Sequence, residues 1–178
     1  MKNLPEYYWD TSIFLMVLNG ETDHGFTVDG ETISGQEVLD GAKDILKQVE
    51  AEEAVIISSQ VMVVEVLPSK VTPQAYEKFE AWLQWRNLVV RAVDHPIAKK
   101  AAMIRDKCLC YPLPGGDKVK IRTVDPIHIA TALIYGIEVI HAVDTDFMKA
   151  LKYSGESIVP CRPRRIKNPQ GELFVVED

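Results

Sequence analysis

Short apolar runs alternate with longer segments of helical periodicity along the chain, and this alternation constrains the fold more than any other feature. The runs cover residues 7–9, 54–57, 88–90 and 137–143. Short runs of this kind are typical of strands that are buried on both faces. Strands that alternate with helices predict a mainly parallel central sheet with helices on both sides. We therefore expect an α/β fold, built as a three-layer α/β/α domain.

Capping residues and chain breakers mark the expected helices. Helical segments cover residues 34–51, 72–86, 95–108 and 125–136, and a further helix begins near Ser59 and carries Glu65. Residues 20–30 hold three glycines among acids and are expected to form a loop. A chain of 178 residues suits one domain. We predict a domain over residues 1–159, followed by a basic, proline-containing tail over residues 160–178.

Composition excludes several classes of protein. The chain is 47% hydrophobic and 26% charged, which argues against disorder or low complexity. The apolar run at residues 13–18 is far shorter than the roughly 20 residues of a membrane-spanning helix, and no basic segment precedes it. We therefore expect a cytoplasmic protein that does not bind a membrane. The three cysteines are expected to be reduced structural thiols, because a C-x-C spacing is not that of zinc ligands.

Glu65 is a carboxylate within an apolar helix, and such a group requires a partner. Its neighbours about one turn earlier, Val61 and Met62, are apolar. Burying an unpaired carboxylate costs several kcal/mol or forces it to take up a proton. The position therefore indicates that a metal ion or another cation faces Glu65. A salt bridge to Lys or Arg is the alternative that involves no chemistry.

Three aspartates, Asp10, Asp125 and Asp144, are placed where a strand ends or a helix begins. In open parallel sheets, ligands gather beyond the carboxyl ends of the strands, so these side chains could share one edge with Glu65. Asp is also a favoured N-cap, and capping alone would explain all three aspartates. It fits Asp125 best, because Pro126 follows in the first turn. Capping does not explain Glu65, which lies inside its helix.

Four short motifs resemble those of the PIN domain family, which includes VapC-like toxin ribonucleases. They occur in the family's order and span most of the chain, from about residue 7 to residue 147. The motifs are WDTS at residues 9–12, ISSQVMVVE at 57–65, DPIHIATAL at 125–133 and DTDF at 144–147. Each motif is short, and only their combination is specific.

The resemblance implies a metal-dependent nuclease. Mg²⁺ or Mn²⁺ would be held by four catalytic acids, Asp10, Glu65, Asp125 and Asp144. Asp146 would be an auxiliary metal ligand, and Thr11 or Ser12 would orient an acid or a metal-bound water. The family often has Thr or Ser shortly before the fourth acid, where this chain has Ala142 and Val143.

The residues themselves suit this chemistry. Mg²⁺ and Mn²⁺ are hard cations that prefer oxygen ligands, and two such ions about 4 Å apart can activate water and stabilise the leaving oxygen in phosphodiester hydrolysis. A net charge of -6 argues against binding nucleic acid through overall charge, although bound divalent ions would offset it locally. Lys118, Lys120 and Arg122 could steer phosphates toward the acids. Three basic residues in a polar loop are, however, more often solvated surface.

We therefore predict a metal-dependent endoribonuclease that hydrolyses RNA by two-metal-ion chemistry. By family analogy it would be the toxin of a toxin-antitoxin pair, would bind an antitoxin protein and would form a homodimer. The alternative is a catalytically silent module of the same fold that binds RNA or a protein. A phosphotransfer enzyme with Asp10 as nucleophile is disfavoured, because no Lys has a recognisable spacing from the acids. His128 lies one turn into the Asp125 helix, where its ring could donate to a carboxylate, but such a residue is more often a packed histidine, and we expect it to lie outside the site.

Overall fold

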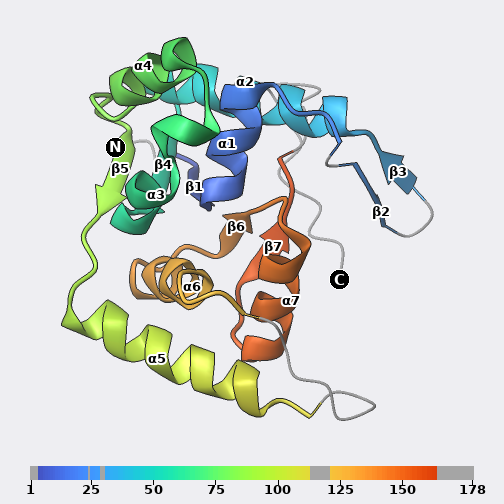
Figure 1. The fold of residues 1–178 in the computed structure, drawn as a ribbon, viewed down its shortest axis with the longest axis vertical. Coiled ribbons are helices and arrows are strands. Elements are labelled where there is room, and N and C mark those ends of the chain that lie inside the picture. Colours follow the sequence, from blue (N-terminus) through green and yellow to red (C-terminus); the bar gives the residue numbers. More distant parts are fainter. Residues whose placement is uncertain (1–3, 24, 29–30, 113–120, 164–178) are drawn as a thin grey trace.

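A parallel sheet forms the centre of the molecule (Figure 1). The computed structural model describes residues 4–23, 25–28, 31–112 and 121–163. Within these residues, five strands pair in the order β5-β4-β1-β6-β7, and all four pairings are parallel. The strands are β1 (Glu6–Trp9), β4 (Val55–Ser59), β5 (Leu88–Arg91), β6 (Val139–His141) and β7 (Val159–Cys161). The predicted α/β class is confirmed.

Helices cover both faces of the sheet and complete the three predicted layers (Figure 1). On one side lie α1 (Thr11–Asn19), α2 (Gly35–Glu50) and α4 (Pro73–Trp82). On the other side lie α5 (His95–Cys110), α6 (Asp125–Ile134) and α7 (Thr145–Ser154). The short helix α3 (Gln60–Glu65) follows β4, and a 3-10 turn, η1 (Pro68–Lys70), leads toward α4.

Two hydrophobic cores follow from the alternation of side chains along each strand. Tyr7, Trp9 and Ile56 enter the core under α1, α2 and α4, whereas Tyr8 and Ile57 enter the core under α5, α6 and α7. Successive strand residues point to opposite faces, so a sheet with helices on both sides needs apolar residues at consecutive positions. This requirement explains why the strand segments are continuous apolar runs.

The strand order places a topological switch point beside β1. After β1 the chain builds β4 and then β5 on one side of it, and it returns to build β6 and β7 on the other. Loops diverge at such a point and leave a crevice at the carboxyl ends of the strands, where ligands bind in open α/β sheets. Asp10 directly follows β1, and Asp144 follows β6 across this crevice.

The structure differs from the sequence prediction at residues 20–30 and at the predicted boundary between domain and tail. The expected loop at residues 20–30 contains β2 (Phe26–Val28), which pairs antiparallel with β3 (Glu31–Ile33); strands of three residues are too short to show a periodicity. The predicted boundary between residues 159 and 160 falls inside β7, and residues 164–178 of the predicted tail lie outside the described part of the chain. No helix in the described ranges is long and apolar enough to cross a membrane.

Candidate active site

Asp10 is the first acid of the site, and its place follows from the end of β1. Its backbone is extended, and its Oδ1 caps α1 by accepting hydrogen bonds from the Ser12 backbone N–H (3.0 Å) and the Ser12 hydroxyl (2.5 Å). The side chain is buried, with only 2% of the residue exposed. Burial raises the pKa of Asp10 to about 6, and the nearby negative charge of Asp144 adds to this rise. A cation at this position would therefore be strongly favoured.

Ser12 joins the ends of β1 and β6. Its hydroxyl donates to Asp10 and accepts a hydrogen bond from the backbone N–H of Val143 at 2.9 Å. The residues before Asp144 offer no side-chain hydroxyl, because they are Ala142 and Val143. Ser12 supplies a hydroxyl at this place from the first turn of α1. The two acids that flank the switch point are thus held in register by one hydroxyl group.

Glu65 has the partners that its apolar helix requires. Its Oε2 accepts a hydrogen bond from the Thr11 hydroxyl at 2.5 Å and lies 3.2 Å from Nε2 of His128. Nδ1 of His128 lies 2.9 Å from the hydroxyl of Tyr8. A carboxylate only accepts, so these contacts are satisfied when Nε2 carries a proton and Tyr8 donates to Nδ1. Burial would raise the pKa of Glu65, but the hydrogen bonds from His128 and Thr11 outweigh it, and the pKa is lowered.

Asp125 does not cap its helix, in contrast to the capping signature of the sequence. Helix α6 already includes Asp125, and Val124 in the N-cap position makes no side-chain capping bond. The Asp125 carboxylate instead accepts from the backbone N–H of Arg122 (3.0 Å) and from Nε of the same residue (3.2 Å). Burial raises the pKa of Asp125, and Arg122 opposes that rise. A buried carboxylate that serves no cap is better explained by a cation facing it.

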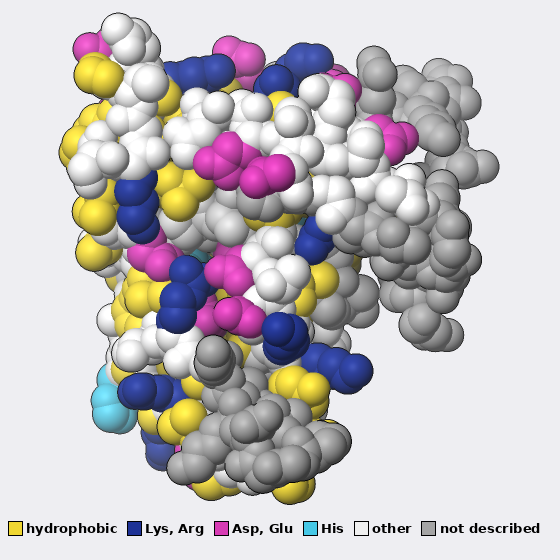
Figure 2. Space-filling model, turned by 45° about the vertical axis from the view of Figure 1, so that its right-hand side comes forward, with side chains coloured by type: hydrophobic (Ala, Val, Ile, Leu, Met, Phe, Trp, Pro, Cys, Tyr) yellow, Lys and Arg dark blue, Asp and Glu magenta, His cyan; other side chains and the backbone are white. Residues whose placement is uncertain are grey.

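Arg122 is the cation that the acids share. Its Nη2 lies 3.0 Å from Oδ1 of Asp125 and 2.7 Å from Oδ2 of Asp144. The charge of Glu65 also acts on the guanidinium. Figure 2 shows acidic side chains gathered around basic ones near the middle of one face of the molecule. The sequence allows a phosphate contact for Arg122 and favours solvated surface, whereas in the structure Arg122 contacts carboxylates. Lys118 and Lys120, of the same prediction, lie outside the described residues.

Asp144 and Asp146 are close in sequence but lie in different surroundings. Asp144 caps α7 by accepting from the backbone N–H groups of Asp146 (2.8 Å) and Phe147 (3.3 Å), and it also pairs with Arg122. The Asp146 side chain is half exposed and forms an ion pair with Lys149 at 3.1 Å. Hydrogen bonds and charge interactions therefore connect Asp10, Glu65, Asp125 and Asp144. Asp146 lies outside this group, because it pairs with Lys149 on the surface of α7.

The donors suit a hard divalent cation, but their present arrangement is held by a guanidinium. All four acids offer carboxylate oxygens, the ligands that Mg²⁺ and Mn²⁺ prefer. Within the described residues, however, no three His, Cys, Asp or Glu side chains converge closely enough to hold a metal ion. Asp10 repels Asp144, and Asp125 repels Asp144 as well. A metal that bound both Asp125 and Asp144 would have to take the place of Arg122.

The sequence model of the PIN domain family matches residues 33–152, which is more than half of the chain. The chain belongs to the PIN domain family. The matched range includes three of the four acids and begins after Asp10. Among curated proteins, none matches the chain significantly in sequence.

Solved structures of VapC-type proteins share the PIN fold of this chain. VapBC2 from Rickettsia felis, bound to a DNA fragment from its promoter, matches with a TM-score of 0.58 and 14% identity, over 87% of this chain and 96% of that one. The sarcin-ricin loop cleaving toxin VapC20 from Mycobacterium tuberculosis matches with a TM-score of 0.56 and 18% identity, over 81% of this chain and 94% of that one. At these identities, the likeness establishes the fold.

The sequence does not predict that His128 and Arg122 belong to the acidic site. His128 is packed, as expected, and only 1% exposed, but its partners include Glu65. Its position one turn after Asp125 is the available signal, since residues three apart share a helix face. Arg122 belongs to a basic segment of the sequence, and its contact with Asp144 joins residues 22 positions apart, which no local pattern reveals.

Proposed function

We propose that this chain is a metal-dependent endoribonuclease that hydrolyses phosphodiester bonds at the site formed by Asp10, Glu65, Asp125 and Asp144. The observation that carries the proposal is the gathering of Glu65, Asp125 and Asp144, from separate segments, around one cation beside the buried Asp10, at the switch point of a parallel sheet. Membership of the PIN domain family supports a nuclease. The structural relative VapC20, a toxin that cleaves the sarcin-ricin loop, favours RNA as the substrate class.

In this proposal the four acids hold Mg²⁺ or Mn²⁺, with Asp146 as an outer acid. Such ions, when bound, lower the pKa of a coordinated water and neutralise charge on the leaving oxygen, and two of them can act together. Thr11 and His128 keep Glu65 ionised and oriented. Ser12 positions Asp10 against the end of β6. Arg122 offsets part of the negative charge of the acids before a metal binds. Once a metal takes its place, Arg122 would be free to contact a phosphate.

The test is cleavage of a mixed set of single-stranded and structured RNAs with Mg²⁺, Mn²⁺ or EDTA. The variants are Glu65→Gln and a matched control, Glu138→Gln, which changes an exposed acid just before β6, at the opposite edge of the sheet. We expect cleavage that needs metal, is lost in Glu65→Gln and persists in the control. Cleavage that is retained in Glu65→Gln or in EDTA would refute the assignment of this site.

A biological role as the toxin of a toxin-antitoxin pair is part of the proposal, with an antitoxin protein and a second copy of the chain as partners in the cytoplasm. Two structural relatives support it, because VapC20 is a toxin and VapBC2 binds a DNA fragment from its promoter. Induced expression should arrest growth, and Glu65→Gln should relieve the arrest. Growth that continues without any antitoxin would contradict the toxin role. The nuclease activity would still be decided by the cleavage assay.

A catalytically silent RNA- or protein-binding module is the second candidate. One observation favours it, because Arg122 already pairs with Asp125 and Asp144 and the described residues include no preformed metal cage. It predicts that purified protein binds RNA without cleaving it and that Mn²⁺ does not bind. Calorimetric titration with Mn²⁺ separates the two candidates without depending on the choice of RNA.

A further inference from the structure

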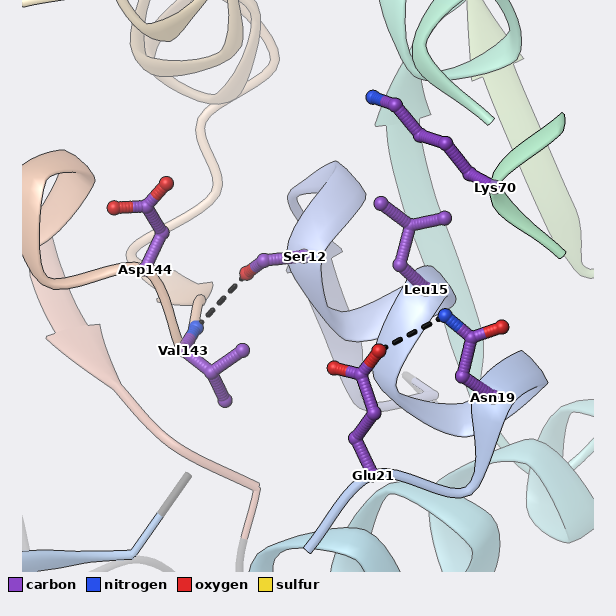
Figure 3. A pocket seen from close by; sticks show the side chains of 7 residues that line it. All are labelled: Ser12, Leu15, Asn19, Glu21, Lys70, Val143 and Asp144. Atoms are coloured by element: carbon purple, nitrogen blue, oxygen red, sulfur yellow. Dashed lines mark hydrogen bonds between the residues drawn. The ribbon is translucent and has the colours of Figure 1, made fainter. Parts of the chain in front are cut away.

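The acidic site is open to solvent on one side and closed on another. On the open side, Ser12, Val143 and Asp144 line part of a pocket of about 460 Å³ (Figure 3). On the closed side lies His128, which does not line that pocket and whose side chain is only 2% exposed. A ligand can therefore reach Asp144 directly from solvent, whereas His128 can act only through its neighbours.

Both ring nitrogens of His128 are engaged by the protein. Nδ1 lies 2.9 Å from the Tyr8 hydroxyl, and Nε2 lies 3.2 Å from Oε2 of Glu65 and 3.3 Å from the Thr11 hydroxyl. A metal ligand or a general base needs a ring nitrogen with a free lone pair that faces the ligand. The ring of His128 offers none in this arrangement, so its role is to hold a neighbour.

The neighbour that His128 holds is one oxygen of Glu65. The Thr11 hydroxyl donates to Oε2 at 2.5 Å, and the Nε2–H of His128 points to the same oxygen. A carboxylate oxygen has about two acceptor positions, and these two donors fill both. In the described part of the chain, every hydrogen bond that reaches the Glu65 carboxylate ends on Oε2. Oε1 is therefore the oxygen that remains for a cation.

Helix α3 needs these contacts because it is short. It has six residues, of which only Met62 is buried, and Val64 is 70% exposed. A helix of this length is marginal without tertiary contacts, and helix ends fray. Glu65 is the last residue of α3. The two donors therefore fix a side chain that the helix by itself would leave mobile.

The same contacts join the helices that carry the other acids. Thr11 follows Asp10 at the start of α1. His128 lies three residues after Asp125 in α6, and residues three apart share a helix face. The contacts on Oε2 thus set the position of Glu65 relative to both aspartates.

We propose that His128 is a positioning residue that, together with Thr11, holds Oε2 of Glu65 and leaves Oε1 to bind a divalent cation. The inference rests on the proposed nuclease function. It assigns to a buried histidine a part in metal binding although the ring contacts neither the metal nor the substrate.

Two amide substitutions separate a positioning role from a structural one. The amide of Gln can place an N–H near the position of Nε2, whereas the shorter amide of Asn reaches only the position of Nδ1. Each metal-free protein is titrated with Mn²⁺ by calorimetry at pH 7.5, and urea unfolding in EDTA measures its stability. His95→Asn, at an exposed histidine that begins α5, is the matched control.

We expect His128→Asn to raise the Kd for Mn²⁺ by about 10- to 100-fold, because removing a hydrogen-bond partner of a metal ligand weakens metal binding by this factor. His128→Gln should recover most of that loss, and His95→Asn should bind as wild type does. An unchanged Kd in His128→Asn, or equal losses in the Asn and Gln variants, would overturn the inference.

A second pair of variants at Thr11 keeps the test decisive if His128→Asn does not fold. Thr11→Val removes the hydroxyl at nearly constant side-chain volume and should raise the Kd for Mn²⁺ in the same range. Thr11→Ser retains a hydroxyl and should stay close to wild type. Equal Kd values for the Val and Ser variants would contradict the proposed use of Oε2.

A readout without metal examines the hydrogen bond itself. Imidazole ¹⁵N NMR of the protein in EDTA should show a proton on Nε2 of His128, and an unprotonated Nε2 would overturn the inference. Wild-type protein that binds no Mn²⁺ would refute the metal site and this inference together. Wild-type binding that His128→Asn leaves unaffected would refute the inference alone, and the nuclease function would stand.

Discussion

Replacing Arg122 by methionine should make the protein bind Mn²⁺ more tightly. The methionine keeps much of the aliphatic length of the side chain and removes the guanidinium, which lies 3.0 Å from Asp125 and 2.7 Å from Asp144. Mn²⁺ cannot take those carboxylate oxygens while the guanidinium holds them. The wild-type protein must break both ion pairs before it binds metal, and the variant has none to break.

The exposure of Arg122 limits the size of the effect. Its side chain is 53% exposed, and ion pairs of this kind contribute about 0.2–1 kcal/mol each. Because the Asp125 end is almost fully buried, we take the upper end of that range, which gives about 2 kcal/mol for the two pairs. Since about 1.4 kcal/mol corresponds to tenfold in affinity, the Kd for Mn²⁺ should fall by about ten- to thirtyfold. Without metal, the variant should be less stable by a similar free energy, because the acids repel one another.

Isothermal titration with Mn²⁺ at pH 7.5 measures this effect, at a pH where Asp10, with a pKa of about 6, is ionised. Urea unfolding in EDTA measures the loss of stability. Arg105→Met, on the exposed face of α5, is the matched control and should change neither quantity. Unchanged or weaker Mn²⁺ binding in Arg122→Met would refute the competition argument, and weaker binding would show that the guanidinium supports the metal site.

Three further perturbations test the contacts around the acids and in the core beside them. His128→Phe removes the ring nitrogens that contact the Tyr8 hydroxyl and Glu65, and it should lower the free energy of unfolding by about 1 kcal/mol in urea, because Tyr8 keeps its hydrogen bonds with Thr131 and the Ser58–Ser59 segment; an unchanged free energy would contradict a stabilising role of the ring. Ser12→Ala removes the hydroxyl that donates to Asp10 and accepts from Val143, so the pKa of Asp10 should rise above about 6 in a carboxyl NMR titration, and an unshifted titration would count against the contact. Burial lowers the pKa of His141 to about 3. The stability that neutral His141 provides is therefore complete above the unfolded pKa of about 6.5 and is lost as the pH falls toward 3. When the pH is lowered from 7 to 4.5, the free energy of unfolding of the wild type should fall by about 3 kcal/mol more than that of His141→Gln. Equal losses in the two proteins would refute the assignment.

The fold could be predicted because its signals are local. The apolar runs that form β1, β4, β5 and β6 are continuous, as a sheet with helices on both faces requires, and capping residues mark several helix starts. Asp10 and Asp144 are predicted near strand ends and are N-caps in the structure. The short hairpin of β2 and β3 was missed, because three residues carry no usable periodicity.

The site was predicted less completely because its contacts are long-range. The need of Glu65 for a partner is evident from its apolar neighbours, but the identity of the partners is not. Thr11 and Glu65 are 54 positions apart, and Tyr8 and His128 are 120 positions apart. Asp125 has the sequence signature of a cap and yet binds Arg122.

The sequence by itself determined the alternation of strands and helices and the presence of acids at their junctions, because both depend on neighbours within a few turns. Only the tertiary structure decided which acids face one another, that Arg122 stands between Asp125 and Asp144, and that Ser12 links β1 to β6. The physical reason is the strand order. Placing β1 between β4 and β6 brings distant segments to one edge of the sheet, and the charges gathered there are set by packing across the fold.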